Sequence, residues 1–239
     1  MMNVQDKVCI VTGGNKGIGR GVVETFSKAG AKVVFALGRD EAALKEVETL
    51  ASNIRGVKLD VTNEEGIKEF VAKVVEEFGK IDVLVNNAGV TRDKLIQRMT
   101  SDDWDFVTNI NLKGVFTFTK LVVPTMLKNE SGSIINISSV VGLDGNIGQS
   151  NYAAAKGGVI AMTKGWAKEF TRKGAQIRVN AVAPGFTQTD MIQHVPEKVL
   201  EAISQKVMLK KLGDVEDIAN ACLFLASDAS KYITAQTLG

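Results

Sequence analysis

Apolar residues follow two alternating patterns along the chain, short continuous runs and longer segments with helical spacing. The short runs are rich in Val and Ile, and they predict buried strands at Lys7–Thr12, Lys32–Leu37, Val57–Val61, Val83–Val85, Ser133–Ile137, Ile177–Val182 and Tyr232–Thr237. The longer segments predict helices at Ile18–Ala29, Glu41–Ser52, Glu64–Phe78, Asp102–Leu127, Asn151–Arg172 and Asp214–Ala226.

Strands that are apolar throughout and alternate with helices are typical of a parallel sheet covered on both faces. Short connections favour right-handed crossovers, which wind such a sheet in both directions. No internal repeat or linker is visible, and the three prolines are scattered. We therefore expect a single-domain α/β fold over residues 1–239, a Rossmann-type doubly wound parallel sheet with about seven strands and helices on both faces.

Composition and charge exclude several classes of protein. Apolar residues make up 45% and charged residues 23% of the 239 residues, which argues against intrinsic disorder. The net charge is only +2 and no Lys/Arg block occurs, so we expect no nucleic-acid partner. No run of ~18 apolar residues is present, which predicts no membrane span. The N-terminal segment lacks the features of a signal peptide, so we expect a cytoplasmic protein.

Cysteine and histidine are scarce. Cys9 and Cys222 both stand in apolar runs, which predicts two buried thiols rather than a disulfide scaffold. His194 is the one histidine of the sequence, so a multi-histidine metal site cannot be built, and we expect no metal. Proton chemistry is therefore expected from Tyr, Lys, Ser, Asp or Glu.

A glycine-rich segment, Thr12–Gly19, joins the first predicted strand to the first predicted helix. Glycines there permit a tight turn and a close approach of backbone amides to a phosphate at the helix N-terminus. The alternative is a plain tight turn. The segment between a buried strand and an amphipathic helix favours a dinucleotide held by Gly13, Asn15, Lys16, Gly17, Ile18 and Gly19.

The end of the second predicted strand indicates which dinucleotide is bound. An acidic residue ~20 residues after the glycines would hold the adenosine ribose hydroxyls. Here the strand ends in Gly38 and Arg39, and no carboxylate occurs before Asp40. Arg39, with help from Lys16, suits a ribose 2′-phosphate, so we expect NADPH/NADP rather than NADH. The alternative is that Arg39 is a solvated turn residue.

Tyr152 and Lys156 stand four residues apart in an Ala-rich segment that favours helix. Residues at this spacing share one helix face, so a phenol lies beside an ammonium. A nearby cation favours the phenolate and lowers the pKa of the phenol, and an oxidised nicotinamide would add to the effect. Tyr152 could then act as an acid/base near neutral pH. The alternative is an interfacial tyrosine and a surface lysine.

Several motifs together resemble those of the short-chain dehydrogenases/reductases in order and spacing. They are Thr12–Gly19, Asn86–Gly89, Asn111, Ser139, Tyr152, Lys156 and Pro184-Gly185, and the resemblance covers essentially the whole chain. Within that family, residues 86–93, 104–116 and 140–155 are most similar to bacterial 3-oxoacyl-[acyl-carrier-protein] reductases of fatty acid biosynthesis.

The resemblance implies four catalytic residues. Tyr152 would protonate the substrate carbonyl oxygen as the nicotinamide delivers a hydride to carbon. Lys156 would bind the nicotinamide ribose and lower the pKa of Tyr152. Ser139, rather than Ser138, would hydrogen-bond the substrate oxygen, because it immediately precedes Val-Val-Gly. Asn111 would hold a water in a proton relay with Lys156.

The resemblance also implies further cofactor contacts. Asp60 would receive the adenine amino group, and Val61 would pack on the ring. The remaining contacts to the ribose and nicotinamide would come from Asn87, Ala88, Gly89, Pro184, Gly185 and Thr187. Residues at about 189–211, which include Met191, Ile192, His194 and Val195, would form a helical lid over the acyl group.

The implied activity is the NADPH-dependent reduction of a 3-oxoacyl thioester on an acidic acyl carrier protein. The resemblance also implies a homotetramer with the 102–127 and 151–172 helices at one interface. One basic docking position is matched by Lys173 beside Arg172, but Glu130 near Lys128 stands at the other. Relatives continue beyond the position of Gly239 with a short tail that often joins the subunit interface.

Three alternatives remain open. The same chemistry could act on a CoA thioester such as acetoacetyl-CoA. The enzyme could instead be a dehydrogenase of a sugar, polyol or steroid. A catalytically silent dinucleotide-binding scaffold is the third, although such a protein would usually have lost Tyr152 or Lys156.

Overall fold

A computed structural model of the chain describes residues 2–189 and 197–239, and a parallel sheet forms its centre. Its strands are β1 Val8–Thr12, β2 Val33–Gly38, β3 Ile54–Lys58, β4 Val83–Asn86, β5 Ser131–Ile137, β6 Gln176–Val182 and β7 Thr237–Leu238. They are hydrogen-bonded in the order β3-β2-β1-β4-β5-β6-β7, and every pairing is parallel. The chain therefore proceeds outward from β1 in one direction and from β4 in the other, which confirms the predicted doubly wound sheet.

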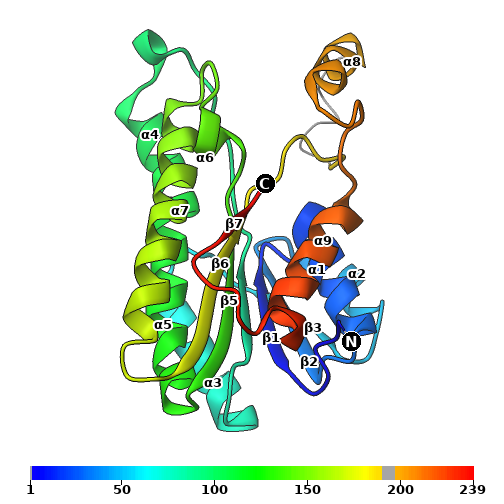
Figure 1. Ribbon diagram of the computed structural model, residues 1–239, viewed down its shortest axis with the longest axis vertical. Coiled ribbons are helices and arrows are strands. Elements are labelled where there is room, and N and C mark those ends of the chain that lie inside the picture. The colour runs from blue at the N-terminus through cyan, green and yellow to red at the C-terminus, as the bar shows by residue number, and fades with distance from the viewer. Residues whose placement is uncertain (1, 190–196) are drawn as a thin grey trace.

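Helices cover both faces of the sheet (Figure 1). One face carries α1 Gly17–Lys28, α2 Glu41–Glu48 and α9 Val215–Ala226. The other carries α3 Glu64–Phe78, α5 Gly114–Lys128 and α7 Ser150–Phe170. The shorter helices α4 Ser101–Thr108, α6 Val141–Asp144 and α8 Glu197–Lys206 lie toward one end of the molecule, at the top of Figure 1. None of the helices described is long and apolar enough to cross a membrane.

The inner strands bury side chains on both faces, because successive residues point to opposite sides. In β1, Val8 and Ile10 pack in the core on the α5 side, whereas Cys9 and Val11 pack in the core on the α1 side. Cys9 and Cys222 are both fully buried and free, as predicted. Burial raises the pKa of Cys222 to about 12, so this thiol stays protonated at neutral pH.

The third strand lies earlier than predicted. It spans Ile54–Lys58 instead of Val57–Val61, and it forms the edge of the sheet beside β2. An edge strand has one open side, so Arg55 and Lys58 tolerate exposure and interrupt the apolar run on which the prediction rested. As a result, Asp60 and Val61 lie in the turn after the strand.

Two further predicted elements have different bounds. The helix expected at 102–127 is divided into α4 and α5 by a π-helical turn, Asn109–Lys113. The last strand is Thr237–Leu238 rather than Tyr232–Thr237. Ala235 has a positive φ of 63°, which breaks the extended backbone, and Tyr232 is fully exposed.

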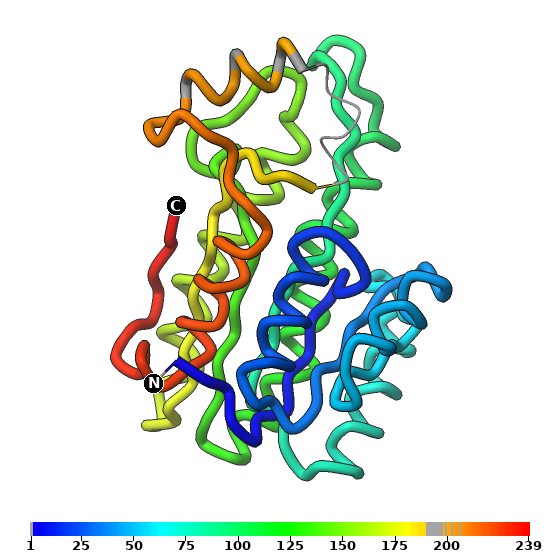
Figure 2. Tube along the Cα trace, turned by 90° about the vertical axis from the view of Figure 1, so that its right-hand side faces the viewer, coloured from blue at the N-terminus to red at the C-terminus, as the bar shows by residue number. Residues whose placement is uncertain are grey.

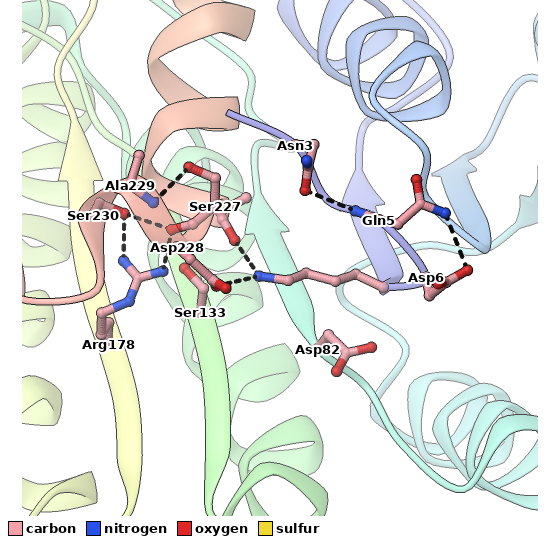
Figure 3. A network of polar contacts seen from close by, with 12 residues as sticks. Asn3, Gln5, Asp6, Asp82, Ser133, Arg178, Ser227, Asp228, Ala229 and Ser230 are labelled. Carbon is pink, nitrogen blue, oxygen red and sulfur yellow. Dashed lines mark hydrogen bonds and ion pairs between the residues drawn. The ribbon is translucent and has the colours of Figure 1, made fainter. Parts of the chain in front are cut away.

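A polar network at the amino ends of the strands joins the N-terminal segment of the chain to the C-terminal one (Figure 3). The Lys7 amine donates to the Ala226 carbonyl at 2.9 Å and lies 3.2 Å from Asp228. Ser133 in β5 donates to the Leu225 carbonyl at 2.9 Å. These contacts satisfy carbonyls at the C-terminal end of α9, where positive charge is favourable. The N-terminal segment consequently lies beside the C-terminal one (Figure 2).

Candidate active site

A cavity of about 630 Å³ opens at the carboxyl ends of the strands. It lies on both sides of the switch point between β1 and β4, where the order of the strands along the sheet reverses. This is the position at which doubly wound sheets bind ligands. Predicted site residues that line it are Gly13, Asn15, Lys16, Gly17, Ile18, Asn87, Gly89, Ser139, Tyr152, Lys156, Pro184, Gly185 and Thr187. The fold therefore brings together segments that follow β1, β4, β5 and β6.

The glycine-rich loop forms one wall of the cavity. Gly13 has a φ of 64°, and a Cβ placed on it would stand 3.0 Å from the Cα of Ala88, so only glycine fits there without strain. Asn87 fixes the loop because its Nδ2 donates to the Thr12 and Gly13 carbonyls at 3.0 and 3.1 Å. Helix α1 then begins at Gly17, and within the described residues no side chain caps its N-terminus. Such a helix end is suited to an anion.

Ser139 and Tyr152 bring two hydroxyl groups together on the opposite wall. Ser139 follows β5 and is 8% exposed, and its hydroxyl lies near enough to the Tyr152 phenol to lower the pKa of that phenol. The Ser139 oxygen also accepts the amide of Val141 at 3.1 Å, which fixes its orientation. The neighbouring Ser138 hydroxyl bonds in another direction, donating to the Lys156 carbonyl at 2.8 Å. Ser139 is therefore the serine that faces Tyr152.

Lys156 lies one turn after Tyr152 in α7, as its spacing predicts. Its Nζ is 5.7 Å from the centroid of the Tyr152 ring and donates to the Ile137 carbonyl at 2.7 Å. The residue is 3% exposed, and this burial lowers the pKa of Lys156 from 10.5 to about 8. The lysine is thus a buried amine that can gain or lose a proton close to neutral pH.

The pKa of Tyr152 departs from its ordinary value in the direction opposite to the prediction. Burial raises it, the Ser139 hydrogen bond lowers it, and the charge of Asp93 raises it further. The predicted lowering of the Tyr152 pKa was wrong, because the amine lies over the ring and desolvation of the phenol dominates. Tyr152 is accordingly protonated at neutral pH, which is the form that a proton donor requires.

Asn111 is fully buried in the π-helical turn, and its side chain hydrogen-bonds the loop that follows β4. Its Oδ1 accepts the amide of Val90 at 2.9 Å, and its Nδ2 donates to the Val90 carbonyl at 2.8 Å. A Cβ added to Gly89 would stand 3.6 Å from both Asn111 Oδ1 and Lys156 Nζ, so these two side chains flank Gly89. Oδ1 keeps one lone pair beyond the Val90 bond, and the relay water stays a prediction.

Three predicted cofactor residues line a second cavity of about 420 Å³ instead of the first. In it, Arg39 is an exposed side chain whose guanidinium lies 3.7 Å from the Asp60 carboxylate. Asp60 also accepts the amide of Thr62 at 2.9 Å, so its carboxylate stabilises the turn after β3. Val61 lies beside them. Three other predicted site residues line neither cavity: Gly19, Ala88 and Asn111.

The first cavity has wall residues that sequence reasoning missed. They include Val90, Thr91, Val141, Gln149 and Phe186. Each lies within three residues of a predicted site residue, so adjacency to the motifs was the available signal. None of these side chains is charged, so residue type alone does not mark them as part of a site.

The predicted lid is described only in part. Met191, Ile192, His194 and Val195 lie outside the described residues, whereas α8 begins at Glu197. Figure 2 shows α8 at the same end of the molecule as the loops that follow β5 and β6. Within the described residues, no group of three His, Cys, Asp or Glu side chains could hold a metal ion.

Comparison with known proteins agrees with this geometry. A family model described as Enoyl-(Acyl carrier protein) reductase matches residues 13–239. The 3-oxoacyl-[acyl-carrier-protein] reductase of Thermotoga maritima is 50% identical over 241 residues, which cover 100% of this chain and 97% of the relative. Those of Escherichia coli and Vibrio cholerae are 44% and 43% identical, and both alignments cover 99% of this chain and 96% of the relative. The chain therefore belongs to the short-chain dehydrogenase/reductase family of oxidoreductases.

Proposed function

We propose that this protein reduces the 3-oxo group of acyl thioesters to a 3-hydroxyl group, with NADPH as the hydride donor and an acyl carrier protein as the carrier. The observation that carries the proposal is the meeting of the Ser139 and Tyr152 hydroxyls beside the buried amine of Lys156. The relatives with whole-chain similarity, named 3-oxoacyl-[acyl-carrier-protein] reductases, support the same activity.

The cavity fits the nicotinamide cofactor. It has an uncapped helix N-terminus for a pyrophosphate and a glycine at residue 13, where a Cβ would meet Ala88. Residues of the glycine-rich loop would hold the phosphates, Asn87 to Gly89 the adjoining ribose, and Pro184 to Thr187 the nicotinamide end. Arg39 and Lys16 would hold the 2′-phosphate, with Asp60 and Val61 at the adenine. When bound, NADPH supplies the hydride that adds to the carbonyl carbon.

Tyr152 supplies the proton. Its phenol is protonated at neutral pH, and the O–H bond breaks as the proton passes to the carbonyl oxygen of the substrate. Ser139 donates a hydrogen bond to the same oxygen, which gains negative charge as the π bond of the carbonyl breaks and the C–O single bond remains. The reaction thus adds one hydride to carbon and one proton to oxygen.

Lys156 stabilises the phenolate that Tyr152 leaves behind. Its amine lies 5.7 Å from the ring centroid in a site where water is largely excluded, so attraction between the two charges is stronger than in water. The Ile137 carbonyl holds the amine in this position. Lys156 then returns a proton to Tyr152, and Asn111 would hold the water that links Lys156 to solvent.

Reduction of an enoyl thioester is the second candidate, because the matching family model has that description. The two candidates differ in where the hydride enters. A 3-oxo substrate places the reacting carbon and the oxygen held by Ser139 and Tyr152 in one bond. An enoyl substrate places its carbonyl oxygen three bonds from the reacting carbon. Two hydroxyls that converge on one oxygen favour the ketone.

Initial rates of NADPH oxidation distinguish these functions. Acetoacetyl-carrier protein, acetoacetyl-CoA and crotonyl-carrier protein are compared at equal concentration. We expect the highest kcat/KM with acetoacetyl-carrier protein. A higher value with the crotonyl substrate would overturn the proposal, and a higher value with acetoacetyl-CoA would replace the carrier protein with CoA.

The subunit assembly and the carrier contact extend this proposal. We infer a cytoplasmic homotetramer that uses α4, α5 and α7. Support for an interface on α4 and α5 comes from Trp104, Phe116 and Leu127, which are 40, 45 and 42% exposed. The exposed Arg172 and Lys173 would contact the acidic carrier protein. Light scattering should give the mass of four chains, and a monomer at assay concentration would contradict the assembly.

We also infer one catalytic domain over residues 1–239, with a lid at about 189–211. The described part of that segment contains α8, an amphipathic helix at the end of the molecule where the cavity opens. A trypsin digest should cleave the chain near the exposed Lys198 or Lys210 first, and a saturating 3-oxoacyl thioester with NADP should slow this cleavage. Unchanged cleavage with both ligands would contradict the lid.

A further inference from the structure

Two consecutive residues at the end of β5 hold both ends of Lys156. The carbonyl of Ile137 accepts the Lys156 amine at 2.7 Å, and the hydroxyl of Ser138 donates to the Lys156 carbonyl at 2.8 Å. Ser138 and Lys156 are both 3% exposed, so both bonds lie in the interior. The end of β5 therefore contacts both the side-chain amine and the backbone carbonyl of Lys156.

The same turn of α7 is enclosed from another side by α6. A Cβ placed on Gly142 would stand 2.7 Å from the carbonyl carbon of Lys156 and 2.9 Å from the amide nitrogen of Gly157. The backbone of α6 thus approaches α7 so closely that any side chain at residue 142 would displace one of them. Ser138 and Gly142 leave the turn little room to move.

Hydrogen bonds matter here because the rest of this interface is largely apolar. Apolar contacts have no direction, so side chains such as Ala167 stabilise the packing of α7 without fixing its position along the strand. A hydrogen bond has a defined length and angle, and it does fix that position. A second such bond, from Asn136 Nδ2 to Thr163 Oγ1 at 2.9 Å, lies two helical turns farther along α7.

We propose that Ser138 is a positioning residue for the reduction, which holds the Lys156 turn of α7 against the end of β5. The bond keeps the amine over the Tyr152 ring, and thereby keeps the phenol beside Ser139. This role rests on the proposed function, since it matters for catalysis only if Tyr152 and Lys156 carry out the proton transfer.

The test compares Ser138→Ala with a matched control, Ser133→Ala. Ser133 lies in β5, the strand that Ser138 directly follows, and is 2% exposed. It donates to the Leu225 carbonyl at 2.9 Å, but at the opposite end of the sheet (Figure 3). Each variant loses one buried hydrogen bond from a serine to a helix carbonyl. A merely structural role predicts the same result for both.

We expect Ser138→Ala to lower kcat about tenfold, with the KM for NADPH changed less than about twofold. Ser133→Ala should keep kcat within about twofold of the wild type. Ser138→Thr retains the hydroxyl and should restore most of the lost kcat. Equal losses of kcat in the two alanine variants would overturn the proposal.

A second readout requires neither substrate nor cofactor. NMR of protein labelled at the lysine ε-carbon follows the titration of Lys156, assigned by its absence in Lys156→Met. Wild type and Ser133→Ala should titrate with a pKa of about 8. In Ser138→Ala the amine gains contact with water, so its pKa should rise toward the ordinary value. An unchanged titration together with an unchanged kcat would refute the role of Ser138.

Failure of this inference is distinguishable from failure of the proposed function. If the wild type reduces no 3-oxoacyl thioester, the function is wrong, yet the NMR titration still decides whether Ser138 positions Lys156. If Ser138→Ala does not fold, Gly142→Ala displaces the same turn from the side of α6. It should lower kcat and shift the Lys156 titration, and a variant with neither change would count against the proposal.

Discussion

Replacing Lys156 with methionine should make the protein more stable at neutral pH while abolishing reduction. The amine is 3% exposed, and burial lowers its pKa from 10.5 to about 8. Each unit of pKa shift corresponds to ~1.4 kcal/mol, so the folded protein is about 3 kcal/mol less stable with the ammonium than it would be with an unperturbed one. Methionine keeps the apolar stem and removes the charge.

The sign of the pH dependence follows from the two pKa values. Below pH 8 the amine is protonated in both states, and its burial destabilises the folded protein by the full amount. Between pH 8 and 10.5 the folded protein loses the proton first, and the destabilisation disappears. Losing the bond to the Ile137 carbonyl opposes the gain by about 1 kcal/mol. We therefore expect Lys156→Met to be about 2 kcal/mol more stable at neutral pH, and less stable than the wild type at the alkaline end.

Urea unfolding measured by circular dichroism from about pH 7 to about pH 10, at one protein concentration, checks this expectation. Lys164→Met is the matched control, because Lys164 is exposed on the same helix and its replacement should change stability by less than about 0.5 kcal/mol at every pH. If Lys156→Met is less stable than the wild type at neutral pH, or if the difference does not change with pH, the argument from burial is refuted.

Three other substitutions test the site. Tyr152→Phe should lower the rate of reduction by at least about 100-fold without weakening NADPH binding, which fluorescence titration measures; a variant that keeps most of its activity would exclude the phenol as the acid. Arg39→Ala should raise the KM for NADPH far more than that for NADH, and equal increases would indicate loss of packing instead. Gly13→Ala should weaken NADPH binding more than about tenfold, because its Cβ would meet Ala88 at a positive φ; unchanged affinity in a titration would contradict a tight cradle.

The fold could be predicted where the burial pattern is uniform. The central strand β1 is buried on both faces, so an uninterrupted apolar run marked it correctly. The edge strand β3 contains Arg55 and Gly56, and its apolar pattern was too weak to place it. The π-helical turn around Asn111 had no periodic signal, since an added residue in one turn leaves both flanking helices amphipathic.

In the site, likewise, local relations between residues could be predicted, whereas effects of burial and tertiary packing could not. Residue types and spacing placed Tyr152 and Lys156 on one helix face, because that relation is local. The direction of the Tyr152 pKa shift depends on how deeply the folded chain buries the phenol, which spacing does not reveal. Likewise, the bond between Ser138 and Lys156 joins residues 18 positions apart through tertiary packing.

Burial shifts the pKa values of Tyr152 and Lys156 in opposite directions, and the two shifts together favour the reaction. It raises the first and lowers the second, so each charged form is disfavoured when it stands alone. In the proposed mechanism, however, the phenolate forms beside the ammonium when the phenol gives its proton to substrate, and the same low polarity would strengthen their attraction. On this proposal, the site would stabilise the charge that appears during proton transfer more than the charges that precede it. An arginine could supply the positive charge but could not release a proton near pH 8, so the proposed reprotonation of Tyr152 requires a lysine rather than an arginine at residue 156.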